Sequence, residues 1–176
     1  MNKRFEHAFD KLEGRKMMLW KKLQTLDESK LGEQPDNKSW SIIQVLDHLV
    51  FSESASVNYS KKKLLAGDAL KKPTFFHTQR MGFYNIILLS HFKIKAPAVV
   101  SAPSNTKSFA EAKADFENSR VQLKQFLEDF PEQYMDRAVY RHPLAGRITV
   151  LQMLKFFEAH FIHHTYQIDR TLRRLV

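Results

Sequence analysis

The chain has 176 residues, a formal net charge of +9 at pH 7, 43% hydrophobic residues and no cysteine. The missing cysteine excludes disulfides, thiolate nucleophiles and cysteine-ligated zinc, so a metal site would need His, Asp or Glu ligands. No stretch approaches the roughly 18 consecutive apolar residues of a membrane span, and the charged N-terminus MNKRFEHAFDKLEGRK has no apolar signal core. We therefore expect one cytoplasmic domain over residues 1–176, with no membrane partner.

Patterns with the 3.6-residue period of an amphipathic helix dominate the sequence, while the two-residue alternation of strands is rare. The first pattern predicts a helix over residues 2–29, followed by the polar, turn-rich break LGEQPDNK at 31–38. A second helix begins after Ser41, which forms a capping-box pattern with Gln44, and runs to about Ala66. The N-terminal part of the chain therefore consists of two long helices.

The middle of the chain is less regular. Residues 68–80 are expected to connect to a shorter helix over 81–92, and the two prolines of KIKAPAVVSAPSN (93–105) then oppose helix continuation. This stretch is a long irregular crossover, and long loops of this kind often have a function. The aromatic pairs of this region, Phe75-Phe76 and Phe83-Tyr84, are interpreted as core residues.

Two more long helices follow. Capping-box patterns open both of them, Ser108 with Glu111 and Thr149 with Gln152. The first covers about 109–129, the last runs to about Arg174, and a short extended piece is expected between them, at 134–148. Four long helices, one short helix and a long central crossover predict an all-α protein with the architecture of a four-helix bundle.

Histidines are concentrated in the last helix, where three of them stand within five positions of the segment EAHFIHHTYQI (158–168). Residues four apart lie on the same helical face, so His160 and His164 both fall inside the apolar stripe. His163 falls on the flank. On the second helix, His48 lies beside the apolar stripe, among mostly small or polar neighbours that leave room around its ring.

A buried neutral imidazole has two ring nitrogens to satisfy, and each one left unpaired costs roughly 1–3 kcal/mol. A shared divalent ion removes this cost, because each ring gives one nitrogen to the ion and the other to a neighbouring acceptor. Three nitrogen donors leave a position for water or substrate, as in catalytic sites. The alternative is that each histidine is an ordinary core residue with its own partners, and His48 can join the pair only if the two helices are neighbours.

Several segments resemble the DinB/YfiT-like superfamily of metalloenzymes. They are WSIIQVLDHLVFSE (40–53), FKIKAPAVVSAPS (92–104), HPLAGRITVLQML (142–154) and the run His160-x-x-x-His164-x-x-Gln167. Each segment is loosely defined by itself, but together they span most of the chain in the order of the family. The combination is therefore fairly specific.

The resemblance implies an up-down-down-up four-helix bundle, often a homodimer. It also implies that His48, His160 and His164 hold one divalent ion, whereas His163 matches an additional histidine that is not a ligand. Family members with an assigned reaction are thiol-dependent transferases and isomerases, in which the metal activates a thiol cofactor. Nickel or zinc suits these ligands best, with iron and manganese also open. The expected partner is a small-molecule substrate or a low-molecular-weight thiol.

Three polar residues are candidates for supporting the ligands. Gln44 and Gln167 lie on the histidine faces of their helices, and Tyr59 lies near His48 on the same side. An interhelical hydrogen bond, or simple packing for the tyrosine, is the alternative for each. The sequence offers no evident general base beside the ligands, so catalytic residues are left unassigned.

Other chemistry-bearing residues have weaker links to this site. Glu53 and Glu158 point away from the ligand direction and are interpreted as solvated helix charges. His91 and His142 have no spacing relation to the ligands, although both could approach the site from loops.

The main hypothesis is a metal-dependent enzyme, a thiol-dependent S-transferase or a related hydrolase or isomerase. Two other functions are open. One is a non-catalytic helical module that binds a ligand or dimerises. The other is a nucleic-acid-associated protein, which only the net charge suggests. The basic residues are scattered and their densest groups lie near expected helix ends, where cations complement the helix dipole, so we expect no nucleic-acid partner.

Overall fold

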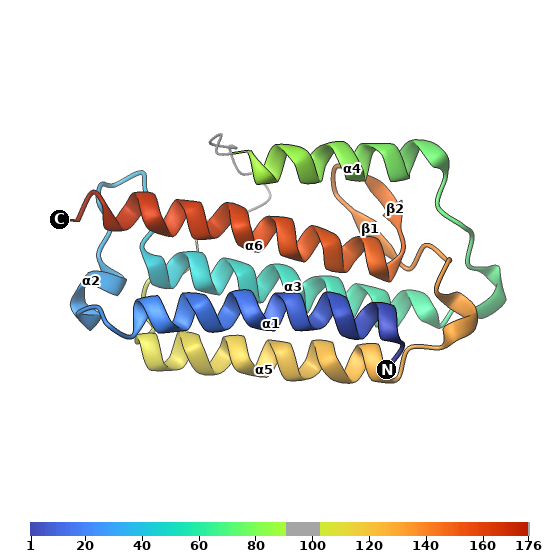
Figure 1. Ribbon diagram of the computed structural model, residues 1–176, viewed down its shortest axis with the longest axis horizontal. Coiled ribbons are helices and arrows are strands. Elements are labelled where there is room, and N and C mark those ends of the chain that lie inside the picture. The colour runs from blue at the N-terminus through green and yellow to red at the C-terminus, as the bar shows by residue number, and fades with distance from the viewer. Residues whose placement is uncertain (91–102, 176) are drawn as a thin grey trace.

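The computed structural model describes residues 1–90 and 103–175 (Figure 1). The helices of these residues are α1 (Lys3–Leu23), α2 (Glu28–Gly32), α3 (Ile42–Leu64), α4 (Phe75–Leu89), α5 (Phe109–Glu128) and α6 (Val150–Leu172), with short 3-10 helices at Gly67–Ala69 and Glu132–Tyr134. A hairpin of β1 (Tyr140–His142) and β2 (Gly146–Ile148) precedes α6. The mostly helical fold expected from the sequence is confirmed, as is the short extended piece before the last helix.

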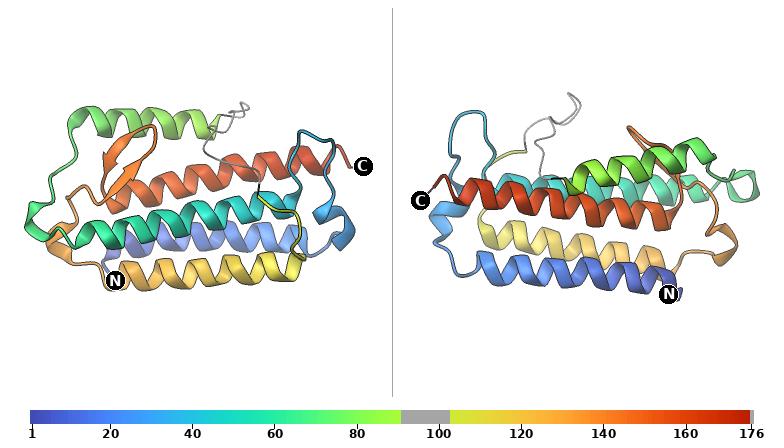
Figure 2. Two further views of the ribbon diagram at one scale, coloured as in Figure 1. Left: turned by 180° about the vertical axis from the view of Figure 1, so that it is seen from behind. Right: turned by 45° about the horizontal axis from the view of Figure 1, so that its top comes forward.

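The four long helices α1, α3, α5 and α6 lie side by side, and α1 and α6 run in the direction opposite to α3 and α5 (Figures 1 and 2). Within this group α3 packs against both α5 and α6, and α1 packs against α6. The shorter helix α4 lies outside it and covers α6 and strand β2 (Figure 2). No helix among the described residues is long and apolar enough to span a membrane.

The three predicted capping boxes are all formed. At the start of α3, the Ser41 hydroxyl accepts a hydrogen bond from the Gln44 backbone N–H, and the Gln44 side chain accepts one from the Ser41 N–H. The same reciprocal pair opens α5 at Ser108 and α6 at Thr149. These caps satisfy N–H groups that the first helical turn leaves without a partner, so they fix where each helix begins.

Two predicted boundaries are wrong. The first helix ends at Leu23 rather than at residue 29, because the Asp27 side chain accepts from the Ser29 N–H and starts the separate helix α2. The shorter helix begins at Phe75, six residues before the predicted start at 81, since Thr74 caps it. Phe75, Phe76 and Phe83, which the sequence suggested as core, are instead 79%, 64% and 67% exposed on α4.

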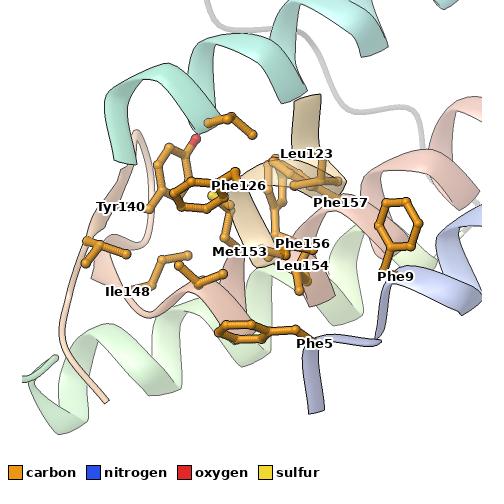
Figure 3. Packing of buried hydrophobic residues seen from close by; sticks show 14 of the residues in the cluster. Phe5, Phe9, Leu123, Phe126, Tyr140, Ile148, Met153, Leu154, Phe156 and Phe157 are labelled. Atoms are coloured by element: carbon orange, nitrogen blue, oxygen red, sulfur yellow. The ribbon is translucent and has the colours of Figure 1, made fainter. Parts of the chain in front are cut away.

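The hydrophobic core lies between the long helices and extends to the hairpin. Figure 3 shows one part of it, where Phe5 and Phe9 of α1 and Phe126 of α5 pack near Met153 and Phe157 of α6. A second part gathers around Trp20, Leu46, Phe116 and Phe161. Helices with one apolar stripe bury it in this way against their neighbours, and each fully buried large side chain contributes roughly 1.5–3 kcal/mol.

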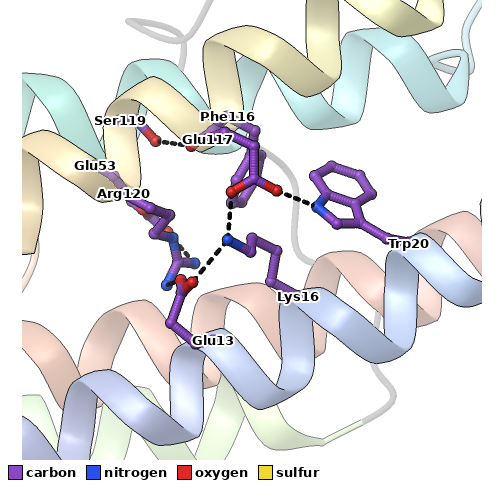
Figure 4. A network of polar contacts seen from close by, with 8 residues as sticks. All are labelled: Glu13, Lys16, Trp20, Glu53, Phe116, Glu117, Ser119 and Arg120. Atoms are coloured by element: carbon purple, nitrogen blue, oxygen red, sulfur yellow. Dashed lines mark hydrogen bonds and ion pairs between the residues drawn. The ribbon is translucent and has the colours of Figure 1, made fainter.

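A buried polar network joins α1, α3 and α5 (Figure 4). The Arg120 guanidinium, 2% exposed, donates to the Glu53 carboxylate at 3.0 Å and lies 3.7 Å from Glu13. Lys16 adds bonds to Glu13 and Glu117. Burial raises the pKa of Glu53, and Arg120 opposes that rise. The interpretation of Glu53 as a solvated charge is therefore wrong, since its side chain is almost completely buried in an ion pair.

The β1–β2 hairpin is held against α4 by a close contact at Gly146. This glycine has a φ of 84°, and a Cβ built on it would lie 2.6 Å from the His77 ring of α4. Only glycine fits both the left-handed backbone and the space left by that ring. The hairpin pairs Tyr140 with Ile148 and His142 with Gly146, and β1 contacts both α3 and α6.

Candidate metal centre

Three histidine side chains from two helices converge between α3 and α6. The Nε2 atom of His160 lies 3.2 Å from Nε2 of His48 and 3.0 Å from Nε2 of His164. All three rings are buried, with 7–8% of their surface exposed. The sequence predicted the pair on the last helix from its spacing, and the contact between α3 and α6 brings His48 to it.

The proton on His164 is fixed by Gln167. The Oε1 atom of Gln167 lies 2.8 Å from Nδ1 of His164. A carbonyl oxygen only accepts hydrogen bonds, so Nδ1 must donate, and Nε2 of the neutral ring is left with a lone pair that faces the other histidines. Burial, helped by the neighbouring His48, lowers the pKa of His164 to about 3, so that the ring is neutral at physiological pH.

The remaining protons cannot satisfy both short contacts. If Nε2 of His160 is protonated, its single N–H can point at only one of the two neighbouring nitrogens. If it is not, two lone pairs meet between His160 and His164, and the proton on Nδ1 of His160 is buried without a partner among the described residues. Burial above all holds the pKa of His160 well below its usual range, so a charged ring does not resolve the conflict.

A divalent ion would resolve it, because each ring then needs only a lone pair at Nε2. Zinc–nitrogen distances of about 2.0–2.1 Å correspond to nitrogen separations of about 2.9–3.4 Å for right-angled to tetrahedral geometry. Two of the three nitrogen separations, 3.0 and 3.2 Å, fall in this range, and all three candidate ligand atoms lie within 4.8 Å of one another. The donor set therefore fits a single ion.

The histidines line a cavity of about 650 Å³. Its walls come from α3, α4, α6, the hairpin and the segment before α3, and they include Trp40, Tyr84, Tyr140 and Phe156. Phe156 stacks on the His160 ring at 5.1 Å between centroids, and Trp40 lies 5.3 Å from the His48 ring. Volumes of roughly 300–1,000 Å³ are usual for small-molecule sites. The cluster therefore borders a cavity of the size that small-molecule ligands occupy.

Comparison with known proteins identifies the family of the chain. The profile of the DinB superfamily matches residues 11–168. The chain belongs to the DinB superfamily. It is also similar to the uncharacterized protein YuaE of Bacillus subtilis (strain 168), with 25% identity over 159 residues that cover 89% of this chain and 91% of YuaE.

The supporting residues expected around this DinB site differ in their placement. Gln167 contacts a candidate ligand directly. Gln44 is occupied in the cap of α3, where its amide also binds Gln34 and the Pro103 carbonyl. Tyr59 is 42% exposed and packs against Tyr140. Among the described residues, neither Gln44 nor Tyr59 lines the cavity, because the cap and the outer surface of α3 hold them elsewhere.

Two other residues near the cluster are held by different partners. Glu158 pairs with Arg15 of α1 at 2.7 Å, so its carboxylate is turned away from the histidines. His163 is buried beside α4, where it bonds the Leu88 backbone, and burial lowers its pKa. Its ring meets that of His164 edge-on at 5.3 Å. The converging nitrogens of the described residues belong to His48, His160 and His164.

His142 is a residue of the cavity that spacing did not identify. Its Nδ1 accepts hydrogen bonds from the backbone N–H groups of Leu144 and Ala145, so the proton of the neutral ring must be on Nε2, at the opposite side. Burial lowers the pKa of His142 to about 4, which keeps the ring neutral. The turn residues HPLAG were the available signal, because they bend the backbone around this ring. His91, the other loop candidate, lies outside the described residues.

Proposed function

We propose that this DinB protein binds one divalent metal ion through His48, His160 and His164 and is a metal-dependent enzyme. The observation that supports the ligand set is the convergence of three buried Nε2 atoms that protons alone cannot satisfy. Nickel or zinc is the proposed ion, since neutral imidazoles suit both. Once bound, the ion would supply a Lewis acid that makes a thiol or a water molecule more nucleophilic.

The proposed reaction class is a thiol-dependent S-transfer, or a related hydrolysis or isomerisation. The resemblance to thiol-using family members supports it, together with a cavity large enough for a small thiol and a second molecule. Aromatic side chains around the histidines exclude water from one side of a bound molecule. His142 offers an N–H donor whose tautomer is fixed by two backbone contacts, suited to an oxygen of the substrate.

The proposal also includes the helix topology, the oligomeric state and the location of the protein. The opposed directions of α1/α6 and α3/α5 in Figure 1 support an up-down-down-up four-helix bundle. A single domain over residues 1–176 and a long central crossover are part of the same proposal, and residues 91–102 of the crossover lie outside the described residues. The exposed Phe76, Phe83 and Ile86 of α4 support a homodimer that covers this helix. A cytoplasmic location is part of the same proposal, and light scattering of the purified protein measures its oligomeric state.

Metal content tests the ligand assignment. His160→Ala should lose the metal that the wild type holds near unit stoichiometry after purification without added metal, and it should keep its helical circular dichroism. His7→Ala is the matched control, because His7 is an exposed histidine of α1. Full metal retention by His160→Ala, or equal loss in His7→Ala, contradicts the assignment.

A second candidate is a non-catalytic binding or dimerisation module. The observation that favours it is the absence of a carboxylate from the described cavity lining, so that a general base there could come only from a histidine. Metal-loaded protein that binds low-molecular-weight thiols in a thermal-shift screen, yet turns over no electrophile offered with them, would favour this module over the enzyme.

A further inference from the structure

We propose that the cavity binds a small organic anion, whose acidic group is held by Arg170 and Arg173 at the C-terminal end of α6 while its other end reaches the three histidines. This inference rests on the proposed function for the reacting end. It adds the chemical class of the ligand: an elongated molecule with a carboxylate or similar acid at one end, an apolar middle, and a metal-binding atom such as a thiol sulfur at the other.

The charge of the cavity is entirely of one sign. Among its described lining residues there is no Asp or Glu, while Lys38, Arg170, Arg173 and Arg174 all contribute cations. Arg174 is already neutralised, since it pairs with Asp36 and also donates to Ser39. In the described part of the chain the other three cations have no carboxylate within ion-pair distance. A cleft lined by one sign of charge concentrates ligands of the opposite sign.

The arginines are close enough to act on the same ligand as the histidines. Arg170 and Arg173 line the same cavity as His160 and His164. Arg170 follows His164 by six residues and Arg173 by nine, which corresponds to about 9 and 14 Å along the axis of α6. An ion as small as phosphate or acetate cannot span this distance, but an extended organic acid can.

Much of the remaining cavity wall is apolar, with Gln167 as a polar residue on α6 between His164 and Arg170. Trp40, Tyr84, Leu88 and Phe156 line the cavity together with the histidines, and Thr171 lies on the α6 side between the arginines. Apolar walls with a few polar groups at the ends are typical of sites that orient an amphipathic molecule. The cavity therefore selects both for the acid and for an apolar segment of matching length.

The arginines also have an alternative explanation, because cations in the last turn of a helix stabilise its dipole. That effect acts on helix stability and does not distinguish one ligand from another. Discrimination between a charged ligand and a neutral ligand of the same length therefore separates the two explanations.

The test uses ω-mercaptocarboxylic acids of increasing chain length, the ω-mercaptoalcohols of matching length, and the alkanoic acids that lack the thiol. Affinities are measured by isothermal titration calorimetry on the protein with its metal content determined first. The variant is Arg170→Gln/Arg173→Gln, which keeps side-chain length and removes two charges. Lys61→Gln/Lys62→Gln is the control, since it removes two exposed cations from the last turn of α3, away from the cavity.

We expect the wild type to prefer a mercaptoacid over its alcohol, with an optimum chain length. The arginine variant should bind the acid about ten- to a hundredfold more weakly, as expected for lost charge-assisted hydrogen bonds. Its affinity for the alcohol should stay within about twofold of that of the wild type. The lysine control should bind both ligands with the affinity of the wild type. Equal affinity of acid and alcohol for the wild type, equal weakening of both in the arginine variant, or no binding of any probe at millimolar concentration would overturn the proposal.

The possible outcomes distinguish a failure of the anion site from a failure of the proposed metal site. If the protein holds no metal, the thiol adds nothing and the metal assignment fails, while arginine-dependent binding of the alkanoic acids would still support the anion site. If the metal is present but acids and alcohols bind alike, the metal assignment stands and the anion site is refuted.

Discussion

Gln167 is the residue through which the protonation of the candidate ligands can be changed without removing a ligand. Its Oε1 lies 2.8 Å from Nδ1 of His164 and holds that ring in the tautomer with a free Nε2. Gln167→Met keeps the length and helix propensity of the side chain but removes the acceptor. The Nδ1 proton of His164 then loses its partner and can be exchanged for one on Nε2, where it blocks ligation. Loss of a partner of this kind weakens metal binding by about 10- to 100-fold, or about 1.4–2.7 kcal/mol.

The assay is a competition for zinc between the protein and a chromogenic chelator at fixed pH. Gln125→Met serves as the matched control, because the Gln125 side chain of α5 bonds the C-cap residue Asp129 and does not line the cavity. The His160→Ala variant gives the lower limit of affinity. If Gln167→Met binds zinc within twofold of the wild type, then the tautomer argument is wrong and Gln167 has a packing role.

Three further predictions concern stability and pH. Glu53→Gln should lower the free energy of unfolding by up to about 3–5 kcal/mol in urea titrations, because it leaves the buried Arg120 charge with only the more distant carboxylate of Glu13, at 3.7 Å. The double variant Glu53→Leu/Arg120→Met should recover most of that loss, and a double variant as unstable as the single one would show that the pair itself is stabilising. His142 has a folded pKa of about 4 against 6.5 when unfolded, so the unfolded chain takes up its proton first as the pH falls and stability is lost in this window. His142→Asn, whose oxygen can accept the same backbone N–H groups, should reduce the loss of unfolding free energy between about pH 7 and pH 4 by up to about 3 kcal/mol, and parallel curves for the two proteins would contradict the burial of a neutral ring.

Sequence patterns located the helices where the signal is local. Ser41, Ser108 and Thr149 were all identified as caps, because a capping box involves residues only three positions apart. The start of α4 was missed although Thr74 caps it, since the third helical residue there is His77 and not Glu or Gln. The side of α4 that faces solvent was not predictable either, because its aromatic residues do not follow the usual rule that large apolar side chains are buried.

The candidate site was also predictable only where the signal in the sequence is local. The i,i+4 spacing was sufficient to put His160 and His164 on one face, whereas the approach of His48 depends on packing between α3 and α6, which no local pattern contains. From the sequence, only the family resemblance assigned His48 to the same site as His160 and His164. The pair Glu53–Arg120 is separated by 67 positions, and its partner helices were not known to be neighbours. Burial of this carboxylate therefore could not be inferred from its helical position alone.

The buried histidine rings are neutral at physiological pH, and this makes the site suited to a metal ion. Burial keeps His48, with a pKa of about 4, and His164, with a pKa of about 3, neutral at physiological pH. Each neutral ring therefore needs at most a change of tautomer to offer its Nε2 atom to an ion, and protons alone cannot satisfy both short Nε2 contacts. An ion that binds only the folded chain then stabilises it by about 4 kcal/mol at a thousandfold excess over its dissociation constant. The packing of α3 against α6 thus has two consequences. It leaves the Nε2 contacts among the histidines unsatisfied when no metal is bound, and it gives the same histidines their affinity for a metal.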